Sequence, residues 1–346
     1  MSTVSLDSPP VTDPFGIAAD AALGDMARAL DPVHMAPRLE AALRDFRPGS
    51  GPARLQEIRV VRHKPGRRCL IEYRLETATP DGSRELTLIA KARAKHRPET
   101  VFERQRALSG AGFAEDSADG VSVPDAIACF PELNLWLQHK VAGVPSGELF
   151  GRPGAEPLGA RIAEAARKVH RCGVPTKRSH AMADELRILH ERLPEVVRQR
   201  PEWSGRIGRL LAACDRLGAS VAAPVATGIH RDFYQDQVIV SGERLFLIDF
   251  DLYCIGDPGV DIGNFLAHVE EQALRETGDL GAYRAFAGAL RERYLELAGS
   301  DAAAAVDAYA QLTLVRHVYL STLFPQRQPF TATLLELSEQ RLARWM

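Results

Sequence analysis

One short stretch constrains the fold and chemistry of this chain more than any other. It begins with His-Arg-Asp at 230–232, has an amide side chain at Gln237, and ends with Asp-Phe-Asp at 249–251. Between these polar groups, the apolar runs 238–240 and 245–248 flank a Ser-Gly-Glu turn. This pattern predicts a β-hairpin whose open end brings the polar groups together. The simpler alternative is an ordinary hairpin with solvated acids at its ends.

The spacing of these residues resembles the catalytic half of a kinase, in which an aspartate, an amide and a second aspartate serve phosphoryl transfer. The segment 256–264 follows at once and has the form Gly-Asp-Pro-x-x-Asp-x-x-Asn. Together the two segments resemble the aminoglycoside phosphotransferase and choline kinase-like phosphotransferases, which have a protein-kinase-like fold. No Ala-Pro-Glu motif follows, and the short gap between Asp249 and Asp261 leaves little room for a protein-kinase activation loop.

The resemblance implies a role for each residue. Asp232 would orient and deprotonate the acceptor hydroxyl, while Gln237 and Asp249 would hold Mg²⁺ against the phosphates of ATP, with Asp251 assisting the metal. His230 would stabilise the loop. For the two later acids of the segment, structural roles are at least as well supported as catalytic ones. Asp257 before Pro258 is typical of a turn, and Asp261 is typical of a helix N-cap.

Gln237 departs from the family pattern, which has Asn at this position. Its amide oxygen can still ligate a hard cation, but from a side chain one methylene longer. Asp236 is an adjacent oxygen donor that would substitute for it. The departure keeps open a second interpretation, a nucleotide-binding pseudokinase with a regulatory role.

The composition excludes several other classes of protein. The 346 residues carry 43 Lys and Arg against 45 Asp and Glu, which gives no basic surplus for nucleic acid or an anionic membrane. The five cysteines are dispersed without a CxxC pair, and no apolar run is long enough to span a bilayer. We therefore expect a cytoplasmic protein with reduced thiols. P-loop, zinc-ligand and GxSxG patterns are absent, which disfavours a P-loop kinase, a metal-dependent phosphoesterase and a serine hydrolase.

The region 54–94 predicts three strands in a meander, with Lys91 late in the third. By resemblance Lys91 would bind the nucleotide phosphates, with Lys95 as a competitor. The turn 64–68 lies where a phosphate-covering loop belongs. Because it lacks a GxGxxG pattern, its backbone amides and Arg67 or Arg68 would do that work.

A helix predicted at 98–108 carries Glu99 and Glu103. The resemblance implies that one of them pairs with Lys91, and Glu103 is favoured because it lies mid-helix; a solvated helix face is the alternative. Residues 133–145 predict a strand that runs into a Gly- and Pro-containing turn. The family would place adenine against the backbone there, at about residues 138–141, which include Gln138 and Lys140.

These expectations give an α+β fold with two lobes: a small β-rich N-lobe at 51–140 and a larger helical C-lobe at 141–346. Residues 1–50 would be a mobile segment followed by two short helices, broken near Asp31-Pro32. The predicted function is ATP- and Mg²⁺-dependent phosphorylation of a hydroxyl on a polar metabolite or antibiotic-like acceptor. The sequence leaves the acceptor open. Glu270 and Glu271 would attract a cationic amine, or would form a solvated helix face.

Overall fold

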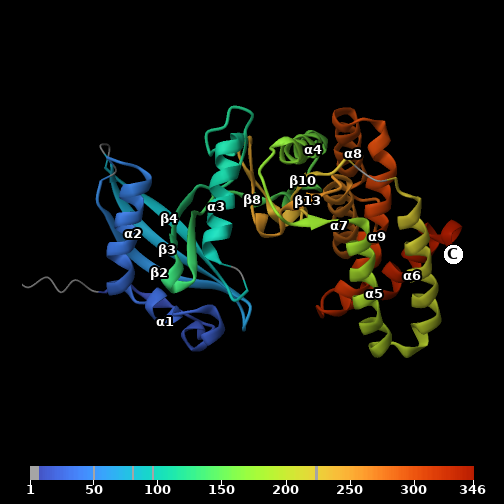
Figure 1. The fold of residues 1–346 in the computed structure, drawn as a ribbon, viewed down its shortest axis with the longest axis horizontal. Helices are drawn as coiled ribbons and strands as arrows, with labels where there is room; N and C mark the ends of the chain where they lie inside the picture. Colours follow the sequence, from blue (N-terminus) through green and yellow to red (C-terminus); the bar gives the residue numbers. More distant parts are fainter. Residues whose placement is uncertain (1–7, 50, 80–81, 96, 223–224) are drawn as a thin grey trace, which may run out of the picture. The chain divides into compact units, whose positions relative to one another are not determined.

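The computed structural model describes residues 8–49, 51–79, 82–95, 97–222 and 225–346. The chain divides into two compact units, Met1–Ala142 and Gly143–Met346. Strands dominate the described part of the first unit and helices that of the second (Figure 1). The predicted α+β class is therefore confirmed.

The first unit is built on a six-stranded sheet in the order β1-β2-β3-β4-β7-β6. Its strands are β1 (Val11–Thr12), β2 (Ala53–Lys64), β3 (Arg68–Thr79), β4 (Gly82–Arg93), β6 (Ala126–Phe130) and β7 (Leu135–His139). The antiparallel meander of β2, β3 and β4 confirms the three predicted strands. Part of the predicted turn between the last two, residues 80–81, lies outside the described residues.

One face of this sheet packs against α1 (Met26–Ala29) and α2 (Pro32–Phe46), forming the main core of the unit. Asp31 is the N-cap of α2, because its carboxylate accepts a hydrogen bond from the N–H of Val33 (2.9 Å). The predicted break between two short helices at this position is confirmed. The hydroxyl of Tyr73 donates to the carbonyl of Ala29 (2.7 Å), which ties α1 to the centre of the sheet.

The N-terminal segment is more ordered than its composition predicts. Residues 1–7 lie outside the described residues, but Val11–Thr12 pair in parallel with Ile58 and Arg59 of β2. The segment predicted to be mobile therefore contains a short paired strand, in which backbone hydrogen bonds offset part of the entropy lost on ordering.

The opposite face of the sheet carries α3 (Pro98–Leu108), which packs against β6 and β7. Side chains alternate along a strand, so Leu135 and Leu137 of β7 join the core beneath α2. Trp136 between them joins a small apolar cluster with Val101 of α3 and Ala126. A short strand, β5 (Val121–Ser122), follows α3.

The second unit contains two small sets of strands. The predicted hairpin consists of β11 (Val238–Ser241) and β12 (Arg244–Leu247), and β8 (Val144–Pro145) pairs with β11. Strand β13 (Cys254–Gly256) pairs with β10 (Thr227–Ile229) on one side and with β9 (Ser179–His180) on the other. The segment between β10 and β11 is the predicted catalytic loop.

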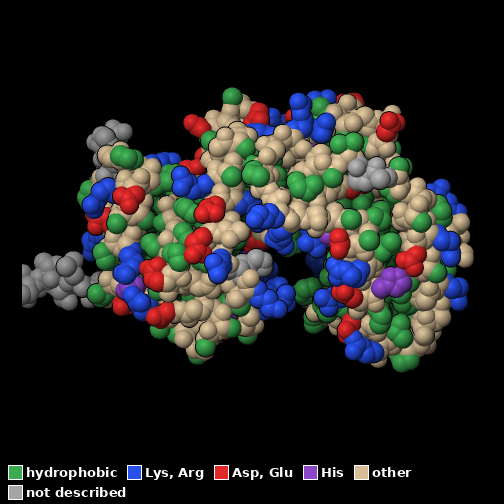
Figure 2. All heavy atoms as spheres, viewed as in Figure 1, with side chains coloured by type: hydrophobic (Ala, Val, Ile, Leu, Met, Phe, Trp, Pro, Cys, Tyr) green, Lys and Arg blue, Asp and Glu red, His purple; other side chains and the backbone are tan. Residues whose placement is uncertain are grey.

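Helices supply most of the second unit: α4 (Glu156–Arg171), α5 (Met182–Gln199), α6 (Ser204–Ser220), α7 (Gly259–Thr277), α8 (Arg284–Ala298), α9 (Ala303–Thr322) and α10 (Thr331–Arg341). Helix α7 packs along α9, and α4 packs along α8. No helix in the described ranges is both long and apolar enough to cross a membrane. Acidic and basic side chains are interspersed over the visible face of each unit (Figure 2).

Candidate active site

Ile248, the residue before Asp249, connects the two ends of the predicted catalytic loop. Its N–H donates to the carbonyl oxygen of Gln237 (3.0 Å). Its own carbonyl oxygen accepts a hydrogen bond from Nε2 of His230 (2.9 Å). The structure thus brings His230, Gln237 and Asp249 to the open end of the hairpin, as their spacing predicts.

His230 is held inside the loop. Its ring is buried and lies between the rings of Phe233 (5.7 Å) and Phe250 (4.5 Å). Because a carbonyl oxygen can only accept, Nε2 is the donor in this hydrogen bond. These contacts suit a residue that holds the loop in place.

Asp261 fixes the backbone at the start of the loop. One carboxylate oxygen accepts from the N–H of His230 (2.8 Å) and the other from the N–H of Arg231 (2.7 Å). Nε2 of His170 reaches the same carboxylate at 3.0 Å, and the hydroxyl of Tyr294 lies 3.1 Å from Nδ1 of His170. The Asp261 side chain is fully buried. The expectation of a simple helix N-cap is therefore wrong: α7 begins at Gly259 and its cap position is Pro258.

Asn264 lies one turn after Asp261 on α7 and holds the middle of the loop. Its amide Nδ2 donates to the carbonyl oxygen of Phe233 (2.8 Å). Its Oδ1 accepts from Arg316 of α9, whose guanidinium also binds Glu185 (3.1 Å). Burial raises the pKa of Glu185, but the Arg316 charge and a hydrogen bond from His180 outweigh it and leave the pKa lowered. An ionised carboxylate therefore braces the loop from α5.

Two backbone conformations at the site are strained. Arg231 and Asp249 adopt positive φ angles of 70° and 63°, which non-glycine residues seldom occupy. Each costs about 1–3 kcal/mol and persists only where surrounding contacts fix it. The Asp261 carboxylate fixes the first. The pinned Ile248 precedes the second, which leads into the 3-10 turn Phe250–Leu252.

The Asp257 carboxylate stabilises the turn that precedes α7. Its Oδ1 accepts from the N–H of Gly259 (2.8 Å). Burial raises its pKa, although this hydrogen bond and one from Tyr309 oppose the shift. These contacts shape the entry into α7, as turn chemistry predicts.

The predicted metal ligands form an oxygen-donor set. Gln237 and Asp251 are buried, while Asp249 is half-buried and Asp236 exposed. Amide and carboxylate oxygens suit a hard divalent cation. Within the described residues, no three His, Cys, Asp or Glu side chains are grouped to hold a metal on their own. A cation here would need phosphate oxygens to complete its shell, which fits an ion carried with a nucleotide.

Lys91 of the first unit lies late in β4 and is 9% exposed. Its Nζ lies 5.0 Å from the centre of the Trp136 ring, directly across the β4–β7 pairing. The expected ion pair with Glu103 is not formed among the described residues. Pro98 and Val101 face the sheet from α3, whereas Glu103 is exposed on the far side of the helix. Lys95 is also exposed.

The turn between β2 and β3 is already bonded to the N-terminal segment. The N–H of Gly66, which has a positive φ of 64°, donates to the Asp20 carboxylate (2.8 Å). Nε2 of His63 lies 2.8 Å from the same oxygen. The hydrogen bond from His63 and that from Gly66 lower the pKa of Asp20, although burial opposes them. The side chain of Arg67 is exposed.

The predicted hinge is held by its own unit. The N–H of His139 donates to the carbonyl of Asp125 and that of Lys140 to the carbonyl of Thr87, both at 2.9 Å. The Lys140 side chain forms an ion pair with Glu72 (2.7 Å), and Gln138 is buried. Gln138 is therefore enclosed by its own unit, whereas the exposed Lys140 side chain is engaged by Glu72.

The sequence that forms both regions matches the model of a known protein family. The model of the phosphotransferase enzyme family matches residues 71–309, which include Lys91, the catalytic loop and α7. The chain belongs to the phosphotransferase enzyme family. It is therefore a phosphotransferase. No curated protein matches the sequence.

Solved structures share the kinase-like fold of this phosphotransferase at low sequence identity. Amicoumacin kinase hAmiN, solved with AMP-PNP, Ca²⁺ and Ami, has a TM-score of 0.56 at 15% identity, covering 82% of this chain and 88% of that one. Choline kinase from Cryptosporidium parvum Iowa II has a TM-score of 0.54 at 13% identity, with coverages of 83% and 89%. A thermostable mutant of aminoglycoside phosphotransferase APH(4)-Ia, in a ternary complex with ADP and hygromycin B, has a TM-score of 0.54 at 15% identity, with coverages of 89% and 98%. These similarities confirm the two-lobed fold.

The sequence alone did not reveal three contacts of the phosphotransferase. Asp261 holds the loop backbone, Trp136 lies beside Lys91, and Asp20 binds the Gly66 turn. Only the contact of Asp261 with the loop has a feature in the sequence that could indicate it. Asp261 and Asn264 are three residues apart, so they share one helix face that both use for the loop. The other two join residues that are far apart in sequence.

Glu270 and Glu271, for which the sequence leaves attraction of a cationic amine open, are both paired with arginines. Arg341 contacts Glu270 through two nitrogens, at 2.7 and 3.0 Å. Glu271 is buried and lies 3.6 Å from Arg275 and 3.7 Å from Arg327. The idea of a solvated face is wrong for Glu271. Because arginines compensate both carboxylates, neither provides a free charge for a cationic acceptor.

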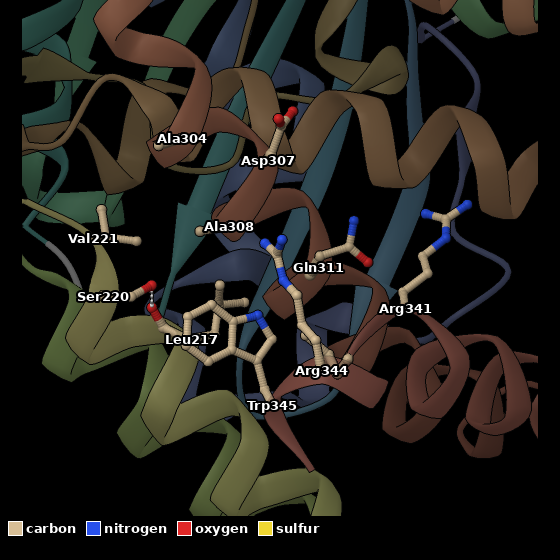
Figure 3. A pocket seen from close by; sticks show the side chains of 11 residues that line it. Leu217, Ser220, Val221, Ala304, Asp307, Ala308, Gln311, Arg341, Arg344 and Trp345 are labelled. Carbon is tan, nitrogen blue, oxygen red and sulfur yellow. Dashed lines mark hydrogen bonds between the residues drawn. The ribbon is translucent and has the colours of Figure 1, made fainter.

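A cavity of about 380 Å³ lies elsewhere in the second unit, between α6, α9 and the C-terminal residues. Figure 3 shows Gln311, Arg344 and Trp345 among the side chains around it. None of the predicted catalytic or metal-binding residues lines this cavity. It does not contribute to the candidate active site.

Proposed function

We propose that this phosphotransferase moves the γ-phosphoryl group of ATP to a hydroxyl group of a small polar molecule. Family membership supports phosphoryl transfer. The observation that carries the residue assignment is the double contact of Ile248, which joins His230, Gln237 and Asp249 around the loop that contains Asp232. Phosphoryl transfer depends mainly on positioning and on stabilising charge, and this loop is built for positioning.

Asp232 would act as the base. It follows directly on Arg231, whose backbone N–H is fixed by Asp261. The acceptor oxygen attacks the γ-phosphorus, the bond from that phosphorus to the β,γ-bridging oxygen breaks, and ADP leaves with the bonding electrons. The hydroxyl proton passes to the Asp232 carboxylate.

Gln237, Asp249 and Asp251 would hold Mg²⁺. When bound, the ion would offset the charge of the β- and γ-phosphates. The contribution of the chain is to hold these oxygens still: Gln237 through its backbone bond to Ile248, and Asp249 through its fixed left-handed conformation. Because Gln237 is one methylene longer than the Asn of the family, the amide oxygen that would ligate Mg²⁺ lies farther from the backbone.

The first unit would bind the nucleotide. Lys91 would contact the phosphates, and the exposed Arg67 of the β2–β3 turn would add a second charge. The N–H groups of His139 and Lys140 are already bonded. Among the described residues, the N–H of Val141 is the first after β7 without a backbone partner, so we propose it as the donor to adenine. Glu103, exposed on α3, is not retained in the site.

The acceptor would be a polar metabolite or an antibiotic-like compound. The relatives named above include kinases of amicoumacin and choline, which supports a small acceptor. The compensated charges of Glu270 and Glu271 give no reason to favour an amine over a neutral polyol.

A product-detecting screen tests the proposal. The full chain would be incubated with Mg²⁺, ATP and a panel of amines, sugars and antibiotic-like alcohols, and products would be sought as a mass increase of one phosphoryl group. We expect one acceptor class to gain phosphate with wild type and not with Asp232→Asn. Nucleotide binding without any product across the panel would favour the pseudokinase interpretation.

A further inference from the structure

Lys91 is a buried cation with an aromatic partner in place of an acidic one. Its side chain lies on β4 with only 9% exposure, and it forms no ion pair among the described residues. Its ammonium lies 5.0 Å from the centre of the Trp136 ring. This is within the range in which a cation is attracted to the face of an indole, and the attraction strengthens as water is excluded.

The helical phase of α3 explains why Glu103, the favoured partner, does not face Lys91. The residues that pack on the sheet are Pro98, Val101, Gln105 and Leu108, at the three- and four-residue spacing of one helix face. Glu103 is two residues from Val101, which places it about 200° around the helix. The polar residue that does face the sheet, Gln105, donates its amide to the carbonyl of Pro124 (2.7 Å).

Trp136 is fixed in place by the sheet and by α3. It is 3% exposed and packs in a cluster with Val101 of α3 and Ala126 of β6. In the sheet its neighbours are Lys91 on β4 and Cys129 on β6. The ring therefore forms a rigid surface on the Lys91 side of the sheet.

We propose that Trp136 is the positioning residue for Lys91 in nucleotide binding, in the role that a glutamate of α3 was expected to fill. This inference rests on the proposed function, in which Lys91 contacts the phosphates. An aromatic ring orients the ammonium without cancelling its charge. Lys91 would thus meet the phosphates with its full positive charge, and its position would not depend on a carboxylate of α3.

Binding of Mg-ATP and of adenosine to the full-length protein, measured by titration calorimetry, tests this. Trp136→Leu should weaken Mg-ATP binding about tenfold, whereas Trp136→Phe, which keeps an aromatic face, should stay within about threefold of wild type. Adenosine has no phosphates, so its affinity should change in neither variant. The matched control Glu103→Gln should bind both ligands like wild type.

A double-mutant comparison makes the test specific. In a Lys91→Ala background, Trp136→Leu should cause no further loss of Mg-ATP affinity, because the ring acts through the lysine. If Trp136→Leu fails to fold, Trp136→Met fills more of the space without a ring and replaces it in both measurements.

Three results would overturn the inference. These are equal losses for Mg-ATP and adenosine, a loss in Trp136→Leu that adds fully to that of Lys91→Ala, and a Glu103→Gln variant as weak as Lys91→Ala. If Lys91→Ala itself binds Mg-ATP like wild type, the proposed role of Lys91 fails and the inference fails with it. In the first three cases a weakened Lys91→Ala would leave the proposed function standing.

Discussion

The catalytic loop of the second unit and the Lys91 region of the first are stabilised in different ways. The loop is held by two buried side chains one turn apart on α7. The Asp261 carboxylate and the Asn264 amide form hydrogen bonds with the loop backbone. Lys91 instead lies on an aromatic ring, and the acidic residue expected beside it points away. The loop therefore depends on hydrogen bonds to buried polar groups, and the position of Lys91 depends on packing and on its attraction to the face of the Trp136 ring.

This difference predicts how each region responds to substitution. Removing one partner of a buried hydrogen-bonded charge leaves unsatisfied groups and costs several kcal/mol. Removing an aromatic neighbour of a cation costs less and is partly restored by another ring. Variants of the loop should therefore lose activity and stability together, whereas variants of the Lys91 region should lose affinity for phosphates.

The largest effect is expected for Asp261→Ala. It leaves the buried N–H of His230 and the part-buried N–H of Arg231 without their acceptor, and His170 without its partner. We expect the free energy of unfolding to fall by about 3 kcal/mol and kcat by at least about a hundredfold. Urea unfolding and turnover of the screened acceptor measure both. The exposed pair of Asp307 with Arg291 supplies the control. Asp307→Ala should cost less than about 1 kcal/mol, and an equal cost would contradict the anchoring role of Asp261.

Substitutions of Gln237 sharpen the loop side of the comparison. If its amide oxygen ligates Mg²⁺, Gln237→Leu should lower activity roughly a hundredfold, because it removes the oxygen while keeping similar bulk. Gln237→Asn, which restores the family residue, should keep activity or change the preference between Mg²⁺ and Mn²⁺. Steady-state rates with each ion measure this. A fully active Gln237→Leu with an inactive Asp236→Ala would move the metal ligand to Asp236.

A pH titration tests the buried polar groups of α9. Burial, together with the charges of Arg316, Arg327 and Arg275, lowers the pKa of His317 to about 3. The unfolded chain takes up a proton near pH 6.5 and the folded chain does not, so stability falls as pH drops from 6.5 toward 3. His317 should account for about 2 kcal/mol of this loss between pH 6.5 and 5. Denaturant unfolding of His317→Leu at both pH values should show a correspondingly smaller decrease; an unchanged decrease would contradict the lowered pKa.

The smallest effect is expected for Lys140→Ala. Its side chain is 43% exposed and forms an ion pair with Glu72, and its backbone N–H donates to the carbonyl of Thr87. A surface pair of this kind contributes little. Mg-ATP affinity should change by less than about threefold, as measured by calorimetry. A tenfold loss would show that the side chain contacts the nucleotide.

The sequence predicts contacts between residues that are close along the chain better than contacts between distant segments. The hairpin, its polar ends and the loop at 230–237 lie within about two dozen residues, and local patterns with a family resemblance predicted them. The spacing around Asp261 is equally typical of a helix N-cap, because spacing alone does not distinguish a carboxylate that caps its own helix from one that binds a neighbouring loop. Glu103 was favoured for its mid-helix position, and the phase of α3 turned it outward. The contacts of Trp136 with Lys91 and of Asp20 with Gly66 join distant segments, and no local pattern indicates either.

The most direct test of the account compares one variant from each region in two measurements. Asp232→Asn and Lys91→Ala would be assayed for Mg-ATP-induced stabilisation and for phosphoryl transfer to the screened acceptor. The account predicts that Asp232→Asn keeps the stabilisation and loses 10²- to 10⁴-fold in kcat, whereas Lys91→Ala loses most of the stabilisation. If Asp232→Asn turns over at the wild-type rate, or if Mg-ATP stabilises neither the wild type nor any variant, the proposed division of roles is contradicted.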